Sequence, residues 1–138
     1  MRSRSFACRA VCVLALTLLC GPVPASAKHG GDGDDGRREA RVAGACSAGA
    51  TSKLRLRSRD GAISVEFEVK RRRGGERWRV VLVHERRVAW RSTIRTKGSS
   101  GSFRIRRSLD DYDGPDAVTA RASGPRGLTC EASATLAA

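Results

Sequence analysis

The sequence predicts an all-β protein, folded as an antiparallel sandwich or barrel, and three observations support this fold class. Apolar and polar residues alternate with a period of two in successive short runs between residues 41 and 136. This alternation is typical of strands that bury one face. Turn residues, above all Gly, Asp and Pro, separate the runs. No long window repeats with the 3.6-residue period of an amphipathic helix, so we expect seven to eight short strands.

The first 27 residues predict export rather than a part of the fold. The first nine residues contain three arginines and no acidic residue, and an apolar run occupies residues 10–20. The triplet 25–27 (Ala-Ser-Ala) follows a turn segment. This order is that of a secretory signal peptide (1–27), with cleavage expected after Ala27. The apolar run is shorter than the ~20 residues that cross a bilayer. We therefore expect a secreted, extracellular protein with no transmembrane segment in its mature chain, or, as the alternative, a lipoprotein acylated at Cys20.

The mature chain divides into an arm and one domain. Residues 28–40 are rich in Gly and Asp and lack an apolar cluster, so we expect a disordered arm. A chain of 138 residues leaves room for a single domain, which we place at 41–138. Of the five Cys, only Cys46 and Cys130 lie beyond the signal peptide. An even pair in an exported chain predicts one disulfide.

Each predicted strand presents one apolar stripe to the core. Trp78 and Trp90 both lie on such stripes, so we expect core packing for both rings, whereas His84 ends a strand and is expected at the surface. In chain order, the stripes are Leu54 and Leu56; Ile63, Val65, Phe67 and Val69; Trp78, Val80 and Leu82; Val88, Trp90 and Ile94; Phe103 and Ile105; Val118, Ala120 and Ala122; Leu128, Cys130, Ala132, Ala134 and Leu136.

The sequence predicts the strand register of the first hairpin. Asp60-Gly61 predicts a two-residue type I′ loop. That loop sets Leu56 opposite Val65 and Leu54 opposite Phe67, with all four side chains facing inward. A slip by one residue would turn these side chains to the solvent, so the register is strongly specified.

The outer face of the same hairpin carries charges of opposite sign. The register sets Arg55 opposite Glu66 and Lys53 opposite Glu68. Glu66 and Glu68 share a face, as the carboxyl pair of a glycosidase would. The cations across the ladder would lower the pKa of both carboxyl groups, which is the wrong direction for a general acid. We therefore interpret these residues as cross-strand ion pairs.

The last hairpin is predicted at Gly124-Pro125-Arg126-Gly127, as a type I turn that closes a three-residue loop. This loop would set Ala122 opposite Leu128 and Ala120 opposite Cys130. Cys130 then points into the core, and its disulfide with Cys46 would join an N-terminal edge strand to the last strand.

Three segments together resemble a known group of proteins. They are LRLRSRDGAISVEFEV (54–69), RWRVVLVH (77–84) and DAVTARASGPRGLTCEASATL (116–136). With the signal peptide and the early Cys, this layout is similar to small secreted proteins of high-GC Gram-positive bacteria that have immunoglobulin-like β-sandwich domains. The resemblance covers roughly residues 42–136 and implies an immunoglobulin-like sandwich and export. It implies no activity and no site residue, and the Cys positions differ from those of antibody domains.

The most basic segment lies at a predicted hairpin tip. Lys70, Arg71, Arg72 and Arg73 are followed by a Gly-Gly bend and by Arg77, in a chain with net charge +13. Such a cluster binds polyanions through phosphate or sulfate contacts and counterion release, without reading a base sequence. Two interpretations remain: a site for polyanions outside the cell, such as teichoic acid, anionic lipid or extracellular DNA, or a solvated loop that keeps strand ends soluble. In either case, neutralising the three arginines is expected to leave the fold intact.

None of these residue patterns supports a catalytic site. We therefore expect a non-catalytic, monomeric module with no cofactor and no resident metal. Its expected partner is an unknown protein or an anionic polymer. No motif for sequence-specific nucleic-acid recognition occurs.

The segment Asp110–Asp116 packs four carboxylates into seven residues. It leaves open a calcium loop or a polar turn, in which Tyr112 would cap a neighbouring loop.

Overall fold

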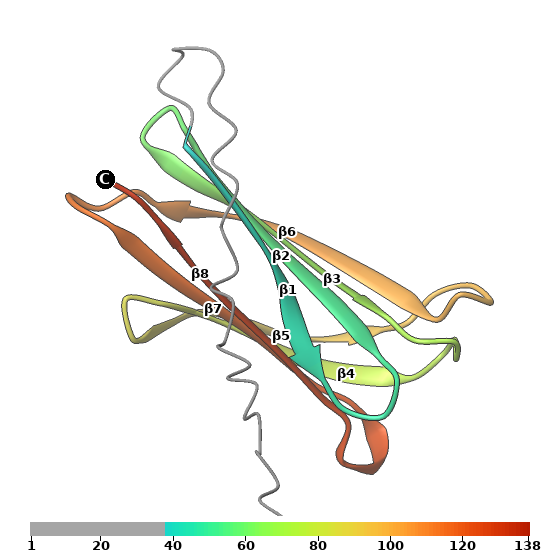
Figure 1. Cartoon of the computed structure of the whole chain (residues 1–138). Helices are drawn as coiled ribbons and strands as arrows, with labels where there is room; N and C mark the ends of the chain where they lie inside the picture. Colours follow the sequence, from blue (N-terminus) through green and yellow to red (C-terminus); the bar gives the residue numbers. More distant parts are fainter. Residues whose placement is uncertain (1–37) are drawn as a thin grey trace, which may run out of the picture. The chain divides into compact units, whose positions relative to one another are not determined.

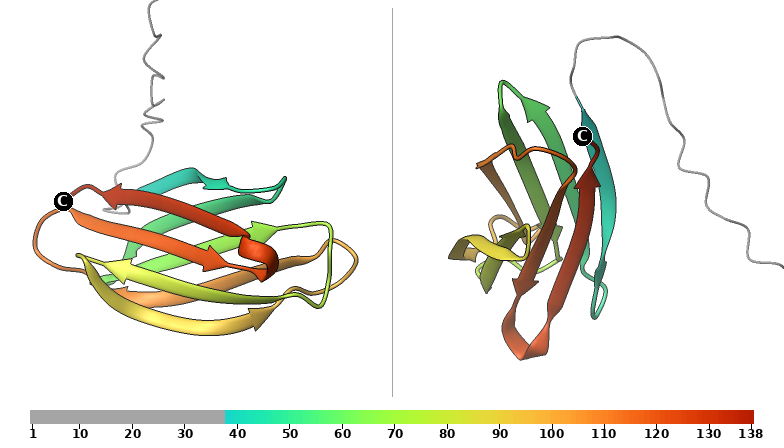
Figure 2. Two further views of the ribbon diagram at one scale, coloured as in Figure 1. Left: turned by 90° about the horizontal axis from the view of Figure 1, so that it is seen from below. Right: turned by 90° about the vertical axis from the view of Figure 1, so that its left-hand side faces the viewer.

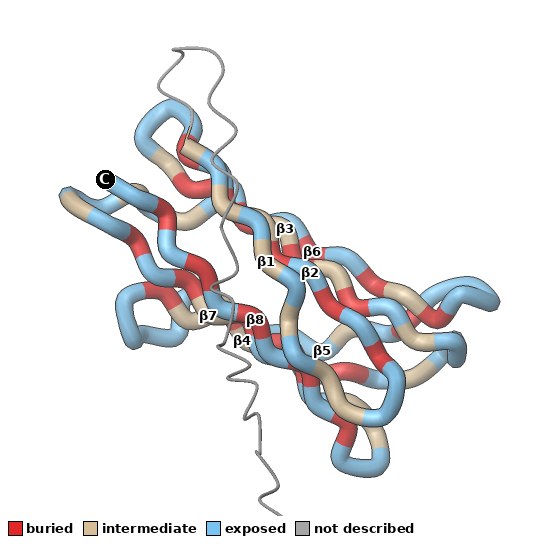
Figure 3. The backbone as a smooth tube through the Cα atoms, in the orientation of Figure 1, coloured by how far each residue is buried: buried red, intermediate tan, exposed pale blue. Residues whose placement is uncertain are grey.

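Eight antiparallel strands form where the alternating pattern predicts them (Figure 1), and along most of them buried and exposed residues alternate, β5 being the main exception (Figure 3). The computed structural model describes residues 38–138. The strands are β1 (Glu39–Cys46), β2 (Thr51–Arg59), β3 (Ala62–Lys70), β4 (Arg77–His84), β5 (Arg87–Arg95), β6 (Ser102–Asp110), β7 (Asp116–Ser123) and β8 (Thr129–Leu136).

The strands form one continuous ladder in the order β5-β4-β7-β8-β1-β2-β3-β6, which folds over into two layers (Figure 2). β1 lies in the middle of this order, and pairs with β2 along Glu39–Gly44 and with β8 at Ala45–Cys46. The prediction that the N-terminal strand is an edge is therefore wrong. The edges are β5 and β6.

The core lies between the layers and consists of the inward stripes. Trp78 is fully buried, and its ring centroid lies 5.9 Å from that of Phe103. Phe67 packs on the other side of Phe103 at 6.4 Å, in an edge-on arrangement that aromatic rings favour. β7 and β8 contribute small residues, chiefly Ala, so the core is thin on their side.

The first hairpin confirms the predicted register. Asp60 and Gly61 both have positive φ, 53° and 73°, as a type I′ turn requires. Leu56 pairs with Val65, and the outer-face partners also match the prediction, since Arg55 pairs with Glu66 and Lys53 with Glu68.

The last hairpin has a different register from the predicted one. Ala122 pairs with Cys130 and Ala120 with Ala132, so the loop is five residues long and the ladder is shifted by two. Arg126 and Gly127 both have positive φ, 57° and 72°, and continue the turn beyond the predicted type I geometry. Because side chains alternate with a period of two, a shift by two leaves Cys130 facing inward.

β5 departs from its predicted stripe. The ladder between β4 and β5 shifts between Leu82 and Val83, so Val88 pairs with Val83 and is 60% exposed instead of buried. Trp90 is only half-buried, because β5 is an edge strand. The guanidinium of Arg107 covers its ring at 4.4 Å, a cation–π contact across the open side of the sandwich.

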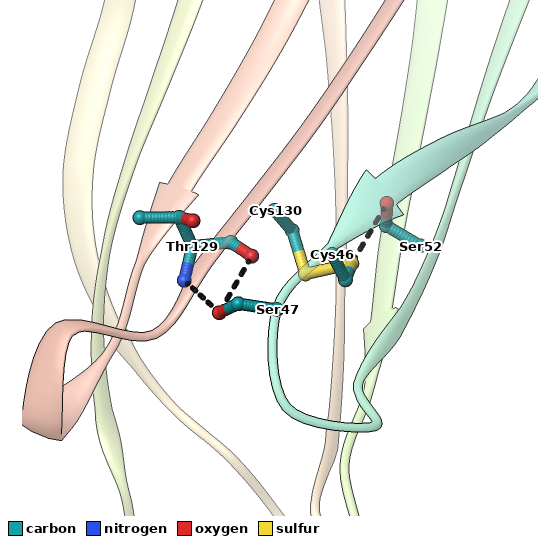
Figure 4. Close-up of a disulfide and its surroundings, with 5 residues drawn as sticks. All are labelled: Cys46, Ser47, Ser52, Thr129 and Cys130. Carbon is teal, nitrogen blue, oxygen red and sulfur yellow. Dashed lines mark hydrogen bonds between the residues drawn. A yellow bond between two sulfur atoms is a disulfide. The ribbon is translucent and has the colours of Figure 1, made fainter.

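The disulfide predicted from the Cys count is present. Cys46 and Cys130 are bonded across 84 residues of sequence, and their Cα atoms lie 4.1 Å apart (Figure 4). They are direct partners in the β1–β8 ladder, close to the point where β1 leaves β2. Beside the bond, the Thr129 amide donates to the Ser47 hydroxyl at 3.0 Å, so covalent and hydrogen-bonded links hold this junction together.

The N-terminal boundary lies slightly earlier than predicted. β1 begins at Glu39, so the last residues that the sequence assigns to the arm belong to the sheet. The signal peptide (1–27) and residues 28–37 of the arm lie outside the described residues, and both stay predictions. Within residues 38–138 there is no helix long and apolar enough to cross a membrane.

A candidate basic binding surface

Two loops pack together at one end of the sandwich, and the first carries the predicted basic segment (Figure 1). Residues 71–76 join β3 to β4, and residues 96–101 join β5 to β6. The Arg71 amide donates to the Gly101 carbonyl at 3.0 Å, and the Gly75 amide donates to the Thr96 carbonyl at 2.9 Å. Backbone contacts therefore hold the first loop in place.

Thr96 is the side chain that ties the two loops together. It is 3% exposed. Its hydroxyl donates to the Arg73 carbonyl at 2.9 Å and accepts from the Glu76 amide at 3.0 Å. Nothing in the local sequence indicates this role, because its partners lie at least 20 residues away.

Gly101 permits this close packing. Its φ is 56°, and a Cβ there would lie 1.8 Å from the Arg71 carbonyl oxygen. Any side chain at this position would push the two loops apart.

The loops and the adjoining strand ends gather five exposed cations, which we call the basic end. Arg77 pairs directly with Arg95 across the β4–β5 ladder, so two arginines lie side by side on the outer face. Each loop adds exposed cations close to this pair. The members are Arg72, Arg73, Arg77, Arg95 and Lys97, all exposed.

Two of the predicted binding residues do not belong to the basic end. The side chain of Arg71 is only 16% exposed and pairs with Glu76 at 3.4 Å, so neutralising it would disturb the loop. Arg72 and Arg73 are therefore the better positions for a neutralising variant, and the expectation that all three loop arginines can be neutralised without effect on the fold stays a prediction. Lys70 lies on the other layer, with its ammonium 3.5 Å from Glu68.

Several cations elsewhere on the sheets have carboxylate partners, although Lys53, Arg79 and Arg91 are exposed and have none among the described ion pairs. Glu39 binds Arg41, Arg55 and Arg57. Burial raises the pKa of Glu39, but hydrogen bonds from Arg41 and Arg57 outweigh this and lower it overall. On β8, Glu131 binds Arg121 at 2.6 Å.

The predicted ion pair between Arg55 and Glu66 does not form, because Arg55 binds Glu39 and Glu66 binds arginines on the opposite side of β3, across the β3–β6 ladder. Glu66 and Glu68 bind arginines of β6, with Arg106 lying 2.8 Å from Glu66 and Arg104 lying 3.3 Å from Glu68. Near the basic end, by contrast, the described ion pairs are those that Glu76 makes with Arg71 and with Arg126. None of the five cations of the basic end has a carboxylate within ion-pair distance in the described part of the chain.

The opposite end of the sandwich carries His84 and the acidic loop, and two predictions fail there. His84 is 5% exposed rather than a surface residue, because its ring bonds Asp116 of β7. Tyr112 stacks on the His84 ring, with the centroids 4.8 Å apart, instead of capping a loop.

The four carboxylates of Asp110–Asp116 do not all meet at one point, although the side chains of Asp111 and Asp116 interact with each other. Asp111 accepts from the Ser58 hydroxyl at 2.8 Å and pairs with Arg38 at 3.1 Å, while Asp116 turns inward to His84. The Ser58 hydrogen bond lowers the pKa of Asp111, although partial desolvation opposes it, and Arg38 adds to the lowering. Among residues 38–138, the metal-ligating group identified at this end includes Asp116 but not the other three carboxylates of the loop.

The comparisons with known proteins give no guide to the site. No protein-family model, no curated protein and no solved structure matches the chain.

Proposed function

We propose that the protein is an exported, non-catalytic, immunoglobulin-like module that binds anionic polymers of the cell envelope through the basic end. The observation that carries this proposal is the gathering of five exposed cations from two packed loops and a strand pair, with no carboxylate partner in the described residues.

The chemistry of the basic end favours a polymer over a small anion. The cations are exposed on two loops and on the adjoining ends of β4 and β5, and none of them lines one of the described pockets, so they suit an extended ligand better than an enclosed one. Arginine binds phosphate or sulfate groups through two parallel N–H donors. Each contact that replaces a condensed counterion adds affinity without selecting a sequence.

The connectivity supports the immunoglobulin-like part of the proposal. The order β4-β7-β8, with a hairpin between the last two, matches the C-F-G order of such sandwiches. On the other layer, β2-β3-β6 is equivalent to A-B-E. β1 is an addition to that plan, because it pairs with both β2 and β8.

Export is supported by the disulfide, because such bonds persist in oxidising compartments. N-terminal sequencing of the protein from culture medium is expected to begin at Lys28. A lipid-modified N-terminus at Cys20 would contradict the proposed cleavage and place the protein on a membrane surface.

Binding to heparin and to purified teichoic acid, measured across a range of salt concentrations, tests the proposed site. The variant Arg72→Gln/Arg73→Gln/Lys97→Gln removes three exposed cations and leaves the buried contacts of Arg71 intact. We expect weaker binding to both polymers and a salt dependence reduced by up to about three units of slope.

The matched control is Arg57→Gln/Arg106→Gln/Arg121→Gln, which removes the same net charge from exposed positions on the outer sheet faces. These arginines have carboxylate partners, and exposed ion pairs contribute little to stability, so the fold should persist. Equal loss of affinity in both triple variants would show that only net charge acts. Elution of the wild type below roughly 0.15 M salt would contradict the function itself.

A further inference from the structure

A buried histidine–carboxylate pair closes the end of the sandwich opposite the basic end. His84 is the last residue of β4 and Asp116 the first of β7. Nε2 of His84 lies 2.7 Å from Oδ1 of Asp116. The side chains are 4% and 0% exposed, so the contact is shielded from water.

Glu85 brings a third potential ligand to this pair. It follows His84 in the two-residue turn to β5, and both turn residues, Glu85 and Arg86, have positive φ, 47° and 63°. That left-handed conformation favours Gly or Asn, so its adoption by Glu and Arg points to a constraint on the turn. One ligand atom from each of His84, Glu85 and Asp116 lies within 4.8 Å of the others.

The arrangement leaves one buried acceptor without a partner. Oδ2 of Asp116 has no hydrogen-bond donor among the described residues, although it is fully buried. A buried carboxylate oxygen without a partner is costly, because it has lost its hydration. A cation placed between Asp116, His84 and Glu85 would supply the missing interaction. Glu85 is exposed, so the ion has a path from solvent.

We propose that His84, Glu85 and Asp116 bind a divalent transition-metal ion of the zinc class. One imidazole nitrogen and two carboxylates are ligands that zinc accepts readily. Calcium fits less well, because it takes six to eight oxygen ligands and no imidazole.

Neighbouring groups already hold the ligands in position. The Tyr112 ring stacks on His84 with an interplanar angle of 10°. The Tyr112 amide approaches Oδ1 of Asp116 at 3.4 Å, and the Ala117 amide donates to Oε1 of Glu85 at 2.6 Å. The ion would join the end of β4 and the β4–β5 turn to the start of β7, away from the Cys46–Cys130 disulfide. Its role is therefore structural.

Isothermal titration of the full, metal-stripped chain with zinc tests the proposal. The wild type is expected to bind one zinc ion per chain. The variant Glu85→Gln changes an exposed ligand without opening the core, and should weaken binding at least ~10-fold. Zinc should also raise the melting temperature of the wild type by several degrees, and that of Glu85→Gln by less.

Two control variants separate this site from other zinc ligands. Asp113→Asn removes an exposed carboxylate of the neighbouring loop, and His29→Gln removes the other histidine of the chain, which lies outside the described residues. Both are expected to bind zinc as the wild type does. Absence of zinc binding to the wild type, or binding that persists in Glu85→Gln and disappears in His29→Gln, would overturn the proposal.

Discussion

Arg77 and Arg95 occupy directly opposite positions in the β4–β5 ladder, and neither has a carboxylate partner in the described part of the chain. The Arg95 guanidinium also donates to the Gly75 carbonyl at 3.2 Å, so one member of the pair is held in place. Like charges in directly opposed positions destabilise a sheet. Their presence at the end where unpaired cations gather is consistent with a surface that is completed by an anionic ligand.

The first prediction follows from this repulsion. Replacing Arg77 with Gln should stabilise the unliganded protein by ~0.2–1 kcal/mol in low salt, because the opposed charge disappears. The gain should shrink as salt screens the repulsion. The same change should weaken polyanion binding. Urea unfolding at two salt concentrations measures the stability, with Arg121→Gln, which instead breaks an ion pair, as the control. A loss of stability in Arg77→Gln at low salt would contradict the prediction.

The second prediction concerns the packing of the two loops. Gly101→Ala should destabilise the protein by ~1–3 kcal/mol, because the new Cβ would meet the Arg71 carbonyl. Gly75→Ala is the matched control, since Gly75 also has positive φ, 77°, but has open space around its Cα. Thermal unfolding of both variants separates the steric effect from the backbone effect. If Gly101→Ala and Gly75→Ala destabilise the protein equally, the close approach of Gly101 to the Arg71 carbonyl does not add to the cost of the Gly101 substitution.

The first hairpin (β2–β3) and the last (β7–β8) show how far the sequence determines register. In the first, apolar pairs on one face and opposite charges on the other agree on a single register with the Asp60-Gly61 turn, and the prediction was confirmed. In the last, the facing side chains are mostly Ala, such as Ala120 and Ala132. These small residues fit a register shifted by two equally well. The length of that loop therefore had to come from the three-dimensional structure.

The candidate site was predicted in part for a similar reason. Arg72, Arg73 and Arg77 stand out as a local run of charge. Arg95 comes opposite Arg77 only because the β4–β5 ladder shifts between Leu82 and Val83, and the sequence does not signal this irregularity. His84 was misplaced because its burial depends on Asp116, which lies 32 residues further along the chain.

The third prediction concerns the disulfide. Closing a loop of 84 residues should stabilise the protein by about 4–5 kcal/mol in the chain-entropy account. The double variant Cys46→Ser/Cys130→Ser should lose a large part of this, and reductant should shift the urea midpoint of the wild type but not that of the variant. Intact mass before and after reduction checks that the bond is present. Two thiols that can be alkylated without reduction would contradict it.

The last prediction follows from the lowered pKa of Asp111. The Ser58 hydroxyl and the Arg38 guanidinium favour its charged form in the folded protein, so its folded pKa lies below the ordinary value of 3.8 for this carboxyl group. A carboxyl group of this kind stabilises the fold above its unfolded pKa and loses that contribution as the pH falls through its folded pKa. Asp111→Asn should therefore be less stable than the wild type at pH 7, and the difference should close below pH 3.8.

Denaturant unfolding of both proteins between pH 7 and roughly pH 2 measures this difference. Asp113→Asn, in the same loop, serves as the control and should follow the wild type at every pH. Ser58→Ala removes the main cause of the shift, so it should raise the pKa of Asp111 and move the loss of stability to higher pH. The difference in free energy of unfolding between the wild type and Asp111→Asn could instead stay constant down to the lowest pH. That result would show that the charged form of Asp111 does not stabilise this end of the sandwich.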